Sequence, residues 1–403
     1  MKSILPRRRF LAHGLSGLAA MMAKPVLFGC SEEAVEPKQG TPTLPRLVSN
    51  LRALGSLNPA DAQGVRLADG FSVRVLAESG KAPLPDKDYV WHQFPDGGAT
   101  FPMTDGGWVY VSNSEFPFTG GVGALRFDAG GELVDAYPIL QNTNVNCAGG
   151  KTPWGSWLSC EEVALGKVYE CDPTGAREAA AHTALGVFKH EAATVDPRSN
   201  VLYLTEDEPD GRLYRFTPTK PNPGGRPDLN AGVLEVMQRQ QDDSVIWHPV
   251  PEPQYSGKLP TRRQVEVSTA FDGGEGLFYF DGVVYFSTKG DNRVWALRLD
   301  EEKLEVLYDA ATASNPILTG VDNLTGTCCG DVLVAEDGGD MQIVAIMSDG
   351  TLKPLVQLEG QDKSEITGPA FDPSGTRLYF SSQRGTNSAG LTYEISGPFH
   401  LPA

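Results

Sequence analysis

The sequence predicts an all-β protein built as a six-bladed β-propeller, and three observations lead to that prediction. Glycine (45) and proline (30) are abundant among the 403 residues, which favours short strands joined by turns. Six apolar segments with polar tips recur at spacings of 48, 45, 82, 48 and 46 residues. A short strand precedes each segment and others follow it, so that each repeat holds about four strands, as a propeller blade does. The segments begin at Trp108, Ser156, Val201, Val283, Asp331 and Arg377.

The N-terminal residues 1–29 are expected to be an export signal and not part of the fold. Arg7, Arg8 and Arg9 precede Phe10-Leu11 and an apolar run that ends at Phe28, which is typical of a twin-arginine signal. Cys30 follows directly and is a candidate lipid acceptor, which would tether the protein to a membrane. Residues 30–63 are expected to form a linker or N-terminal extension. We therefore expect a periplasmic or surface location, and a monomer.

The propeller is expected to span residues 64–400. The one long spacing contains an insertion at about 239–269. The last repeat, residues 364–396, offers only three strands, while the strand FSVRVLAES at 71–79 has no repeat of its own. Pairing that strand onto the last blade would close the ring and cover an exposed edge. A β-sandwich is the alternative fold, but it does not explain the even spacing.

Charge and cysteine usage limit the function classes. The formal net charge of −17 opposes nucleic-acid binding and suits hard cations such as calcium. The cysteines show no CxxC spacing, which argues against a zinc knuckle. The sequence also has no GxSxG motif and no phosphate-binding GxxxxGK[ST] loop.

Carboxylates recur at the ends of the predicted strands that line the channel. The first strands carry Glu191, Glu275, Asp322 and Glu365, and the second-strand tips include Glu161, Glu206 and Glu336. Acids that converge on one cavity repel one another unless cations lie among them, so these positions predict metal binding. Cys160, beside Glu161, would add a soft thiolate ligand that points to a transition metal such as iron.

Five motifs resemble those of the PhoX-type alkaline phosphatase family. They are TPWGSWLSCEE (152–162), FKHEAATVDP (188–197), LYLTEDEPDGRLYRF (202–216), VDNLTG (321–326) and EITGPAFDPSGTRLYFSSQ (365–383). The resemblance implies a six-bladed propeller with Fe³⁺ and Ca²⁺ at one end of the channel. It also implies hydrolysis of phosphate monoesters outside the cytoplasm by a metal-activated water or oxide.

The resemblance assigns site residues as follows. It implies Cys160 as the iron ligand, and it maps the family's channel carboxylates to metal ligands. These are Glu161, Glu191, Glu206, Glu275, Asp322, Glu336 and Glu365. The chain is short for the family, so substrate contacts would come from basic residues near the channel: Lys189, His190 and Arg384 are the candidate catalytic residues.

Two other functions stay open at this point. A calcium-dependent hydrolase of other esters, such as lactones, is compatible with the same fold. A propeller in which metals only stabilise the channel, and another face binds a partner, is also compatible. A thiolate ligand distinguishes these hypotheses, because a calcium-only site has no use for sulfur.

Overall fold

A computed structural model describes residues 46–221 and 225–403. The predicted signal, residues 1–29, and the candidate lipid acceptor Cys30 lie outside the described residues. The helices within the described ranges are single 3-10 turns, and none of them has the length and hydropathy of a membrane span. These turns are η1 (Leu51–Ala53), η2 (Thr183–Leu185) and η3 (Thr261–Arg263).

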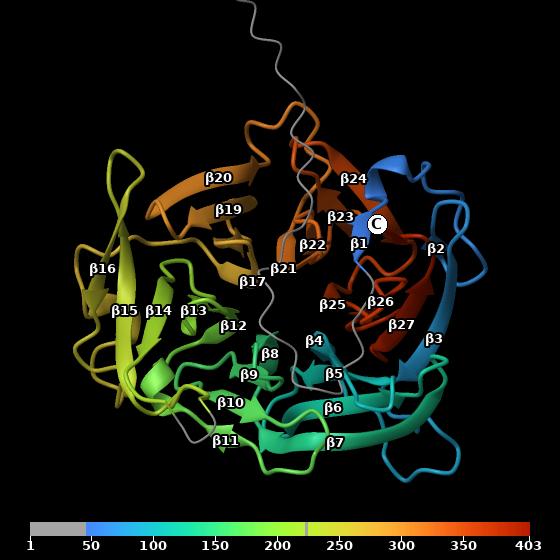
Figure 1. Ribbon diagram of the computed structural model, residues 1–403, viewed down its shortest axis with the longest axis horizontal. Coiled ribbons are helices and arrows are strands. Elements are labelled where there is room, and N and C mark those ends of the chain that lie inside the picture. Colours follow the sequence, from blue (N-terminus) through green and yellow to red (C-terminus); the bar gives the residue numbers. More distant parts are fainter. Residues whose placement is uncertain (1–45, 222–224) are drawn as a thin grey trace, which may run out of the picture. The chain divides into compact units, whose positions relative to one another are not determined.

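Six antiparallel sheets surround one axis as the blades of a propeller (Figure 1). Blade one comprises β4 (Pro95–Pro102), β5 (Trp108–Ser114), β6 (Gly120–Phe127) and β7 (Leu133–Thr143). Blade two comprises β8 (Asn146–Lys151), β9 (Trp157–Glu161), β10 (Val168–Cys171) and β11 (Ala180–Ala181). Blade three comprises β12 (His190–Asp196), β13 (Val201–Glu206), β14 (Leu213–Pro218), β15 (Gly232–Arg239) and β16 (Val245–Pro249).

The remaining blades follow the same plan. Blade four comprises β17 (Gly274–Phe280), β18 (Val283–Thr288), β19 (Arg293–Arg298) and β20 (Lys303–Asp309). Blade five comprises β21 (Val321–Gly326), β22 (Val332–Glu336), β23 (Gln342–Ile346), β24 (Leu352–Leu358) and the edge strand β2 (Val65–Arg66). Blade six comprises β25 (Ile366–Phe371), β26 (Arg377–Ser382), β27 (Leu391–Ser396) and β3 (Ser72–Glu78). The six-bladed fold predicted from the repeat spacing is therefore confirmed.

The N-terminal segment is more ordered than the predicted linker. β1 (Leu47–Ser49) pairs with β28 (His400–Pro402), and Leu51 is fully buried against blades five and six. Residues 46–63 of the predicted linker or N-terminal extension thus pack on the propeller through apolar side chains such as Leu51 and Leu54. β3 is hydrogen-bonded to β27 as the fourth strand of blade six, with Glu78 opposite Leu391.

The insertion extends blade three. β16 pairs with β15 as a fifth strand, which only this blade and blade five have among the described residues. The chain then returns through η3, where the Thr261 hydroxyl donates to the Val187 carbonyl at 2.8 Å. Arg262 of this turn reaches the tip of β13, so the insertion contacts the inner part of its own blade.

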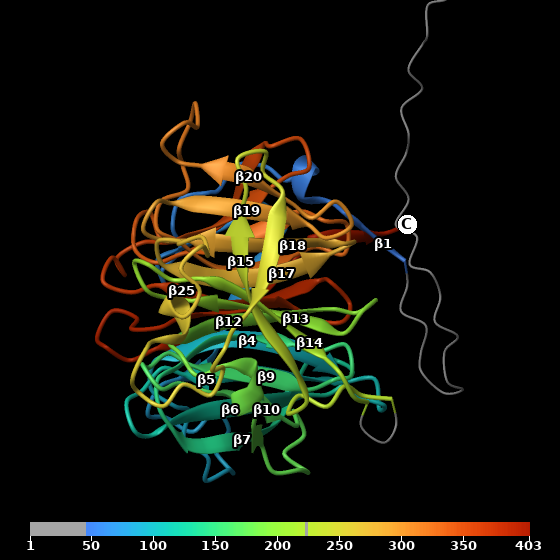
Figure 2. The same cartoon turned by 90° about the vertical axis from the view of Figure 1, so that its left-hand side faces the viewer.

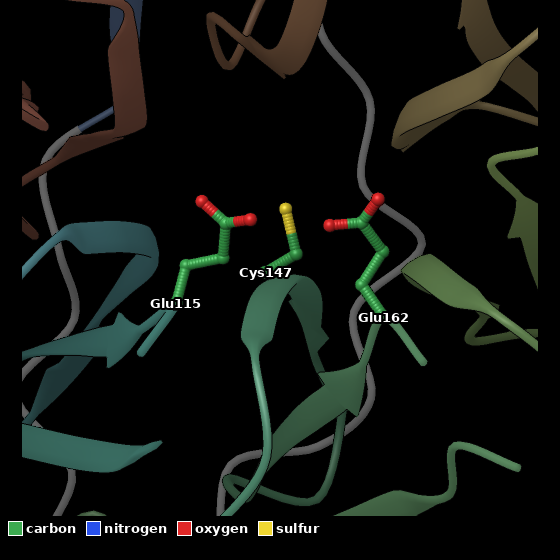
Figure 3. A group of neighbouring side chains, drawn as sticks. All are labelled: Glu115, Cys147 and Glu162. Carbon is green, nitrogen blue, oxygen red and sulfur yellow. The ribbon is translucent and has the colours of Figure 1, made fainter. Parts of the chain in front are cut away.

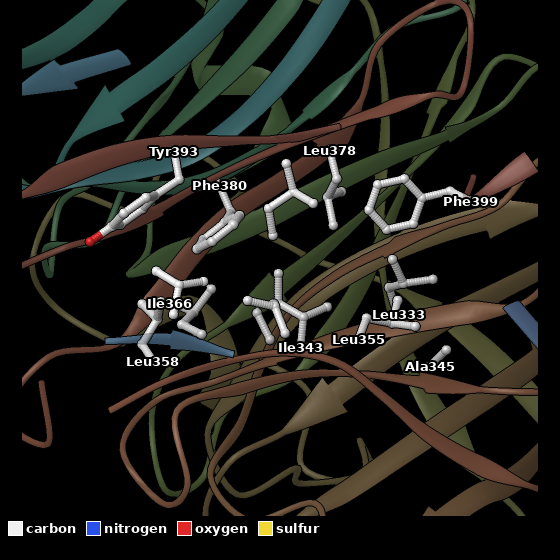
Figure 4. Packing of buried hydrophobic residues seen from close by; sticks show 14 of the residues in the cluster. Leu333, Ile343, Ala345, Leu355, Leu358, Ile366, Leu378, Phe380, Tyr393 and Phe399 are labelled. Carbon is white, nitrogen blue, oxygen red and sulfur yellow. The ribbon is translucent and has the colours of Figure 1, made fainter. Parts of the chain in front are cut away.

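The core consists of apolar layers between neighbouring blades. Figure 2 shows the blades of the propeller from the side. The largest layer joins blades five and six, where Ile343 and Leu355 face Phe380 and Tyr393 (Figure 4). Strands buried on both faces read as nearly continuous apolar runs, which explains sequences such as QIVAI in β23. These layers fix the inclination of each blade and so fix which residues reach the axis.

Candidate metal centre

A bulge near the start of each first strand defines an inner ring of side chains. In all six blades the pairing register between the first and second strands shifts near the start of the first strand. The shift follows the first paired residue in blades one to five and the second paired residue in blade six. A β-bulge re-aims a side chain, and here it occurs at the same point in every blade. The residues at this point are Asp96, Cys147, Glu191, Glu275, Asp322 and Thr367.

A second ring comes from the residue that directly follows each second strand. Its six members are Glu115, Glu162, Asp207, Lys289, Asp337 and Gln383. The backbone N–H of each one donates to the carbonyl of the residue two positions before the inner-ring member of its own blade. The rings therefore share one backbone geometry, and four of the six second-ring side chains are acidic.

Cys147 lies between two carboxylates at the side of the channel formed by blades one and two. Figure 3 shows its sulfur between the side chains of Glu115 and Glu162, and the ligand atoms of the three residues lie within 4.8 Å of one another. Burial, with the nearby carboxylates of Asp96 and Glu191, raises the pKa of the Cys147 thiol. A thiol among carboxylates is a mixed soft and hard donor set, which suits a transition metal.

Glu191, Glu275 and Asp322 form a second group, and all three are buried. Glu191 is 1% exposed, and neither of its carboxylate oxygens has a hydrogen-bond partner. Burial and the neighbouring carboxylates raise the pKa of Glu191. A buried carboxylate without partners is costly, so this arrangement fits a bound cation such as calcium.

Two further groups connect the first two into one acidic basin. Asp96 and Glu115 lie with Glu365, and Asp322 and Asp337 also lie with Glu365. Burial and the charges of neighbouring acids raise the pKa of Glu365 to about 8. The sequence-predicted acids Glu191, Glu275, Asp322 and Glu365 are thus brought together, as the repeat register predicts.

Basic side chains lie at the edge of this basin. Lys189 contacts Glu162 at 2.8 Å and Asp207 at 2.9 Å, so it pairs with second-ring acids. Arg384 contacts Glu365 at 2.5 Å and lies over the Phe94 ring, with 39% of its side chain exposed. The amide of Gln383 donates to Asp96 at 2.6 Å. Of the predicted catalytic residues beside the acids, Arg384 has the more exposed side chain, 39% against 30% for Lys189.

The structure places Cys160, the predicted iron ligand, away from the channel acids. Its side chain is fully buried in the apolar layer between blades two and three, with Leu158 and Val168. Cys160 belongs to none of the potential metal-binding groups found among residues 46–221 and 225–403. Leu158 and Cys160 share one face of β9, because side chains two apart along a strand point the same way.

The last residues of the second strands, Glu161, Glu206 and Glu336, also lie outside the acidic groups. Glu161 accepts hydrogen bonds from the backbone N–H groups of Asn144 and Lys167, at 3.0 and 3.2 Å. Glu336 accepts from the N–H groups of Thr319 and Gln342 at 2.8 and 3.0 Å.

Glu206 has side-chain partners in place of backbone ones. It accepts from the Tyr214 hydroxyl at 2.8 Å and from Arg262 at 3.3 Å. Burial raises its pKa to about 7. All three predicted metal ligands therefore have protein hydrogen-bond partners and lie apart from the acidic groups of the basin.

His190 likewise points into its blade. Its ring stacks on Phe188, its Nε2 donates to the Gly186 carbonyl at 3.1 Å, and burial lowers its pKa to about 3. The imidazole is therefore neutral and shielded, and the structure places this predicted catalytic residue away from the basin.

Sequence reasoning missed Cys147, Asp96 and Glu162 as residues of the basin. Glu162 directly follows Glu161, the predicted strand end, so the pair of carboxylates could have marked it. Cys147 and Asp96 lie at the same bulge position as Glu191, Glu275 and Asp322, so aligning the first strands of the repeats at that position would have found them.

Comparison with known proteins agrees with the propeller fold. A family model described as alkaline phosphatase PhoX matches residues 128–167 and 163–304. A structure of Pseudomonas fluorescens PhoX in complex with vanadate, a transition-state analogue, has the same fold, with a TM-score of 0.69 and 15% identity. That alignment covers 85% of this chain and 98% of the other.

The chain is similar to the PhoX alkaline phosphatase family over residues 128–304. This confirms the resemblance that the five sequence motifs indicate. No curated protein sequence matches the chain.

Two other solved structures have lower TM-scores against this chain. A chain of a nidogen–laminin complex has a TM-score of 0.44 and 13% identity, with 75% of this chain and 98% of that chain covered. The calcium-binding protein regucalcin from Agrobacterium tumefaciens has a TM-score of 0.40 and 15% identity, with 77% and 94% covered.

Proposed function

We propose that this protein is a metal-dependent phosphatase that hydrolyses phosphate monoesters at the axial end of the propeller. The observation that carries the proposal is the acidic basin, in which Cys147 lies between Glu115 and Glu162 and the buried Glu191 has no hydrogen-bond partner. The related P. fluorescens protein binds vanadate, a mimic of phosphoryl transfer, which supports the same chemistry here.

The donor sets suggest where each kind of ion binds. Glu115, Cys147 and Glu162 would hold Fe³⁺, since a thiolate prefers a transition metal. Glu191, Glu275 and Asp322 offer only oxygen atoms, and they would hold Ca²⁺. When bound, the metal ions supply charge to neutralise the phosphoryl oxygens and lower the pKa of an attacking water or hydroxide.

The chain's own residues would orient the substrate. Arg384 is half-exposed at the edge of the basin, and its fork-like guanidinium can bind two phosphoryl oxygens at once. Its contact with the Phe94 ring restrains the side chain before substrate arrives. Lys189 holds Glu162 and Asp207 in place, so its role is to position ligands and not to contact the ester.

Location and partners follow from the N-terminal sequence. The twin-arginine pattern of residues 1–29 supports export to the periplasm or cell surface, and Cys30 supports a lipid tether. The substrate would be a small phosphate ester, and the acidic chain would bind no nucleic acid. We expect the enzyme to act as a monomer, because one chain contributes every residue of the basin.

The direct test uses protein purified through its native export route. Iron and calcium are counted per chain, and hydrolysis of p-nitrophenyl phosphate is compared with hydrolysis of an aryl acetate and a lactone. We expect both metals and phosphate-ester turnover that a chelator abolishes and added metal restores. Turnover of the lactone alone, or metal without any turnover, would contradict the proposal.

A further inference from the structure

Lys289 is the one basic member of the second ring. Its N–H donates to the Gly273 carbonyl at 2.8 Å, as the N–H of Glu115 does to Phe94 and that of Asp337 does to Gly320. The backbone therefore places Lys289 at the ring position that Glu, Asp or Gln occupies in the other blades. Lys289 thus carries a positive charge at a position where four of the other five blades carry a negative one.

The ammonium group of Lys289 lies among three carboxylates. Its Nζ is 3.1 Å from Glu275, 3.4 Å from Asp322 and 3.1 Å from Asp337. Asp322 and Asp337, with Glu365, make up one of the four acidic groups of the basin. Lys289 thus already neutralises part of a group that would otherwise need a cation.

The opposite side of the basin has a different balance. Cys147 lies there with two acids, and both oxygens of Glu191 have no hydrogen-bond partner. The nearest lysine on that side, Lys189, contacts Glu162 and Asp207, and neither of its ion pairs involves Glu191. The negative charge that no nearby side chain balances is therefore greatest near Glu191 and Cys147, and smallest near Lys289.

We propose that Lys289 is a built-in cation that takes the place of one divalent ion, so that no metal ion is shared by Asp322, Asp337 and Glu365, while Asp322 still serves the site with Glu191 and Glu275. The inference rests on the proposed function, because it assumes that the rest of the basin holds metal ions. A fixed ammonium cannot leave, so this part of the centre keeps its charge balance when calcium is scarce. A calcium ion, in contrast, is lost by dilution.

The test changes the charge of residue 289 and counts ions. Lys289→Glu restores the acid found in other blades, and Lys289→Gln removes the charge while keeping a polar side chain. After equilibration with calcium and removal of the unbound ion, we expect each variant to hold about one calcium ion more per chain than the unchanged protein. Calorimetric titration with calcium alone should show the added site directly.

Two controls make the result specific. Arg293→Gln removes a cation from the same blade whose partners, Asp291 and Asp309, lie outside the acidic groups, so its calcium count should stay unchanged. Lys289→Arg keeps the positive charge and should bind no additional ion. Circular dichroism establishes that each variant is folded before metal analysis.

The outcomes separate this inference from the proposed function. If the unchanged protein binds no metal, the proposed function fails. If it binds metal but folded Lys289→Gln and Lys289→Glu bind no more, the inference about Lys289 is overturned, and lower substrate affinity in these variants would instead show that Lys289 binds the ester. Should neither variant fold, a crystal structure of the metal-loaded unchanged protein decides: an ion bound to both Asp322 and Asp337 overturns the inference.

Discussion

Cys147 and Cys160 lie in adjacent strands of one blade, and yet their surroundings are opposite. Cys147 follows the first residue of β8 at a bulge and lies between carboxylates in the channel. Cys160 is in the regular part of β9 and packs among leucine and valine side chains. The comparison teaches that the position of each cysteine in its strand, and not the residues beside it in the sequence, decides which thiol faces the channel acids.

The same rule separates consecutive acids. Glu161 and Glu162 are neighbours, but Glu161 binds backbone N–H groups of its own blade while Glu162 lies beside Cys147. Burial raises the pKa of Glu162 to about 8, and the ion pair with Lys189 opposes this increase. Acids that face the blade are satisfied by protein donors, whereas acids that face the channel are satisfied only in part.

The largest effect is expected from substitution of this pair of glutamates. Glu162→Gln removes a channel carboxylate beside Cys147, and we expect kcat/KM for an aryl phosphate to fall by more than about 100-fold, with iron lost. Glu161→Gln is the matched control. It should keep metal and activity and lose about 1 kcal/mol of folding free energy, because it weakens two hydrogen bonds to backbone.

Steady-state kinetics, metal analysis and urea unfolding measure these three quantities. Equal losses of activity in the two variants would contradict the distinction between acids that face the channel and acids that face the blade.

A smaller effect is expected at the edge of the basin. Arg384→Ala should raise KM for phosphate esters roughly 10–100-fold, since a charged hydrogen bond to substrate contributes about 1.5–3 kcal/mol. The metal content should not change, because Arg384 is a cation and cannot be a ligand. Arg293→Gln, which lies on the outer part of blade four, should leave KM unchanged. An unaltered KM in Arg384→Ala would remove Arg384 from the substrate site.

The smallest effect is expected for an acid with a full set of protein partners. Burial alone would raise the pKa of Glu170, but hydrogen bonds from His182, Ser156 and Trp154 outweigh it and lower the pKa to about 2. A lowered pKa stabilises the fold above the unfolded value near 4.5, and this stabilisation is lost as pH falls toward 2.

Glu170→Gln should therefore cost about 1–2 kcal/mol near pH 7, after allowance for solvent screening, and almost nothing near pH 2. Urea unfolding of both proteins across this pH range gives the difference. A difference that does not depend on pH would show that the ionised form of Glu170 contributes nothing.

The sequence predicts the fold well because the propeller is encoded locally and repeatedly. Each second strand was placed within a residue of its observed start, from Trp108 in blade one to Arg377 in blade six. The convergence of Glu191, Glu275, Asp322 and Glu365 also follows from the repeat register.

Cys147 and Asp96 were not assigned in this way, although Glu191, Glu275 and Asp322 lie at the same bulge position of their blades. A bulge shifts the alternation of side chains, and the carboxylates beside Cys160 favoured that cysteine in place of Cys147. Glu161, Glu206 and Glu336 were favoured for a related reason. The motif places each of them beside an acid that does face the channel, and only the three-dimensional pairing separates the two.

Iron content of two cysteine variants tests the central claim most directly. Cys147→Ala and Cys160→Ala remove the same atom from the same blade, and each is purified through the export route and analysed by mass spectrometry for iron. We predict that Cys147→Ala loses its iron while Cys160→Ala retains it and is only less stable, by about 1–2 kcal/mol. Iron retained in Cys147→Ala and lost in Cys160→Ala would contradict the arrangement of the metal centre described above.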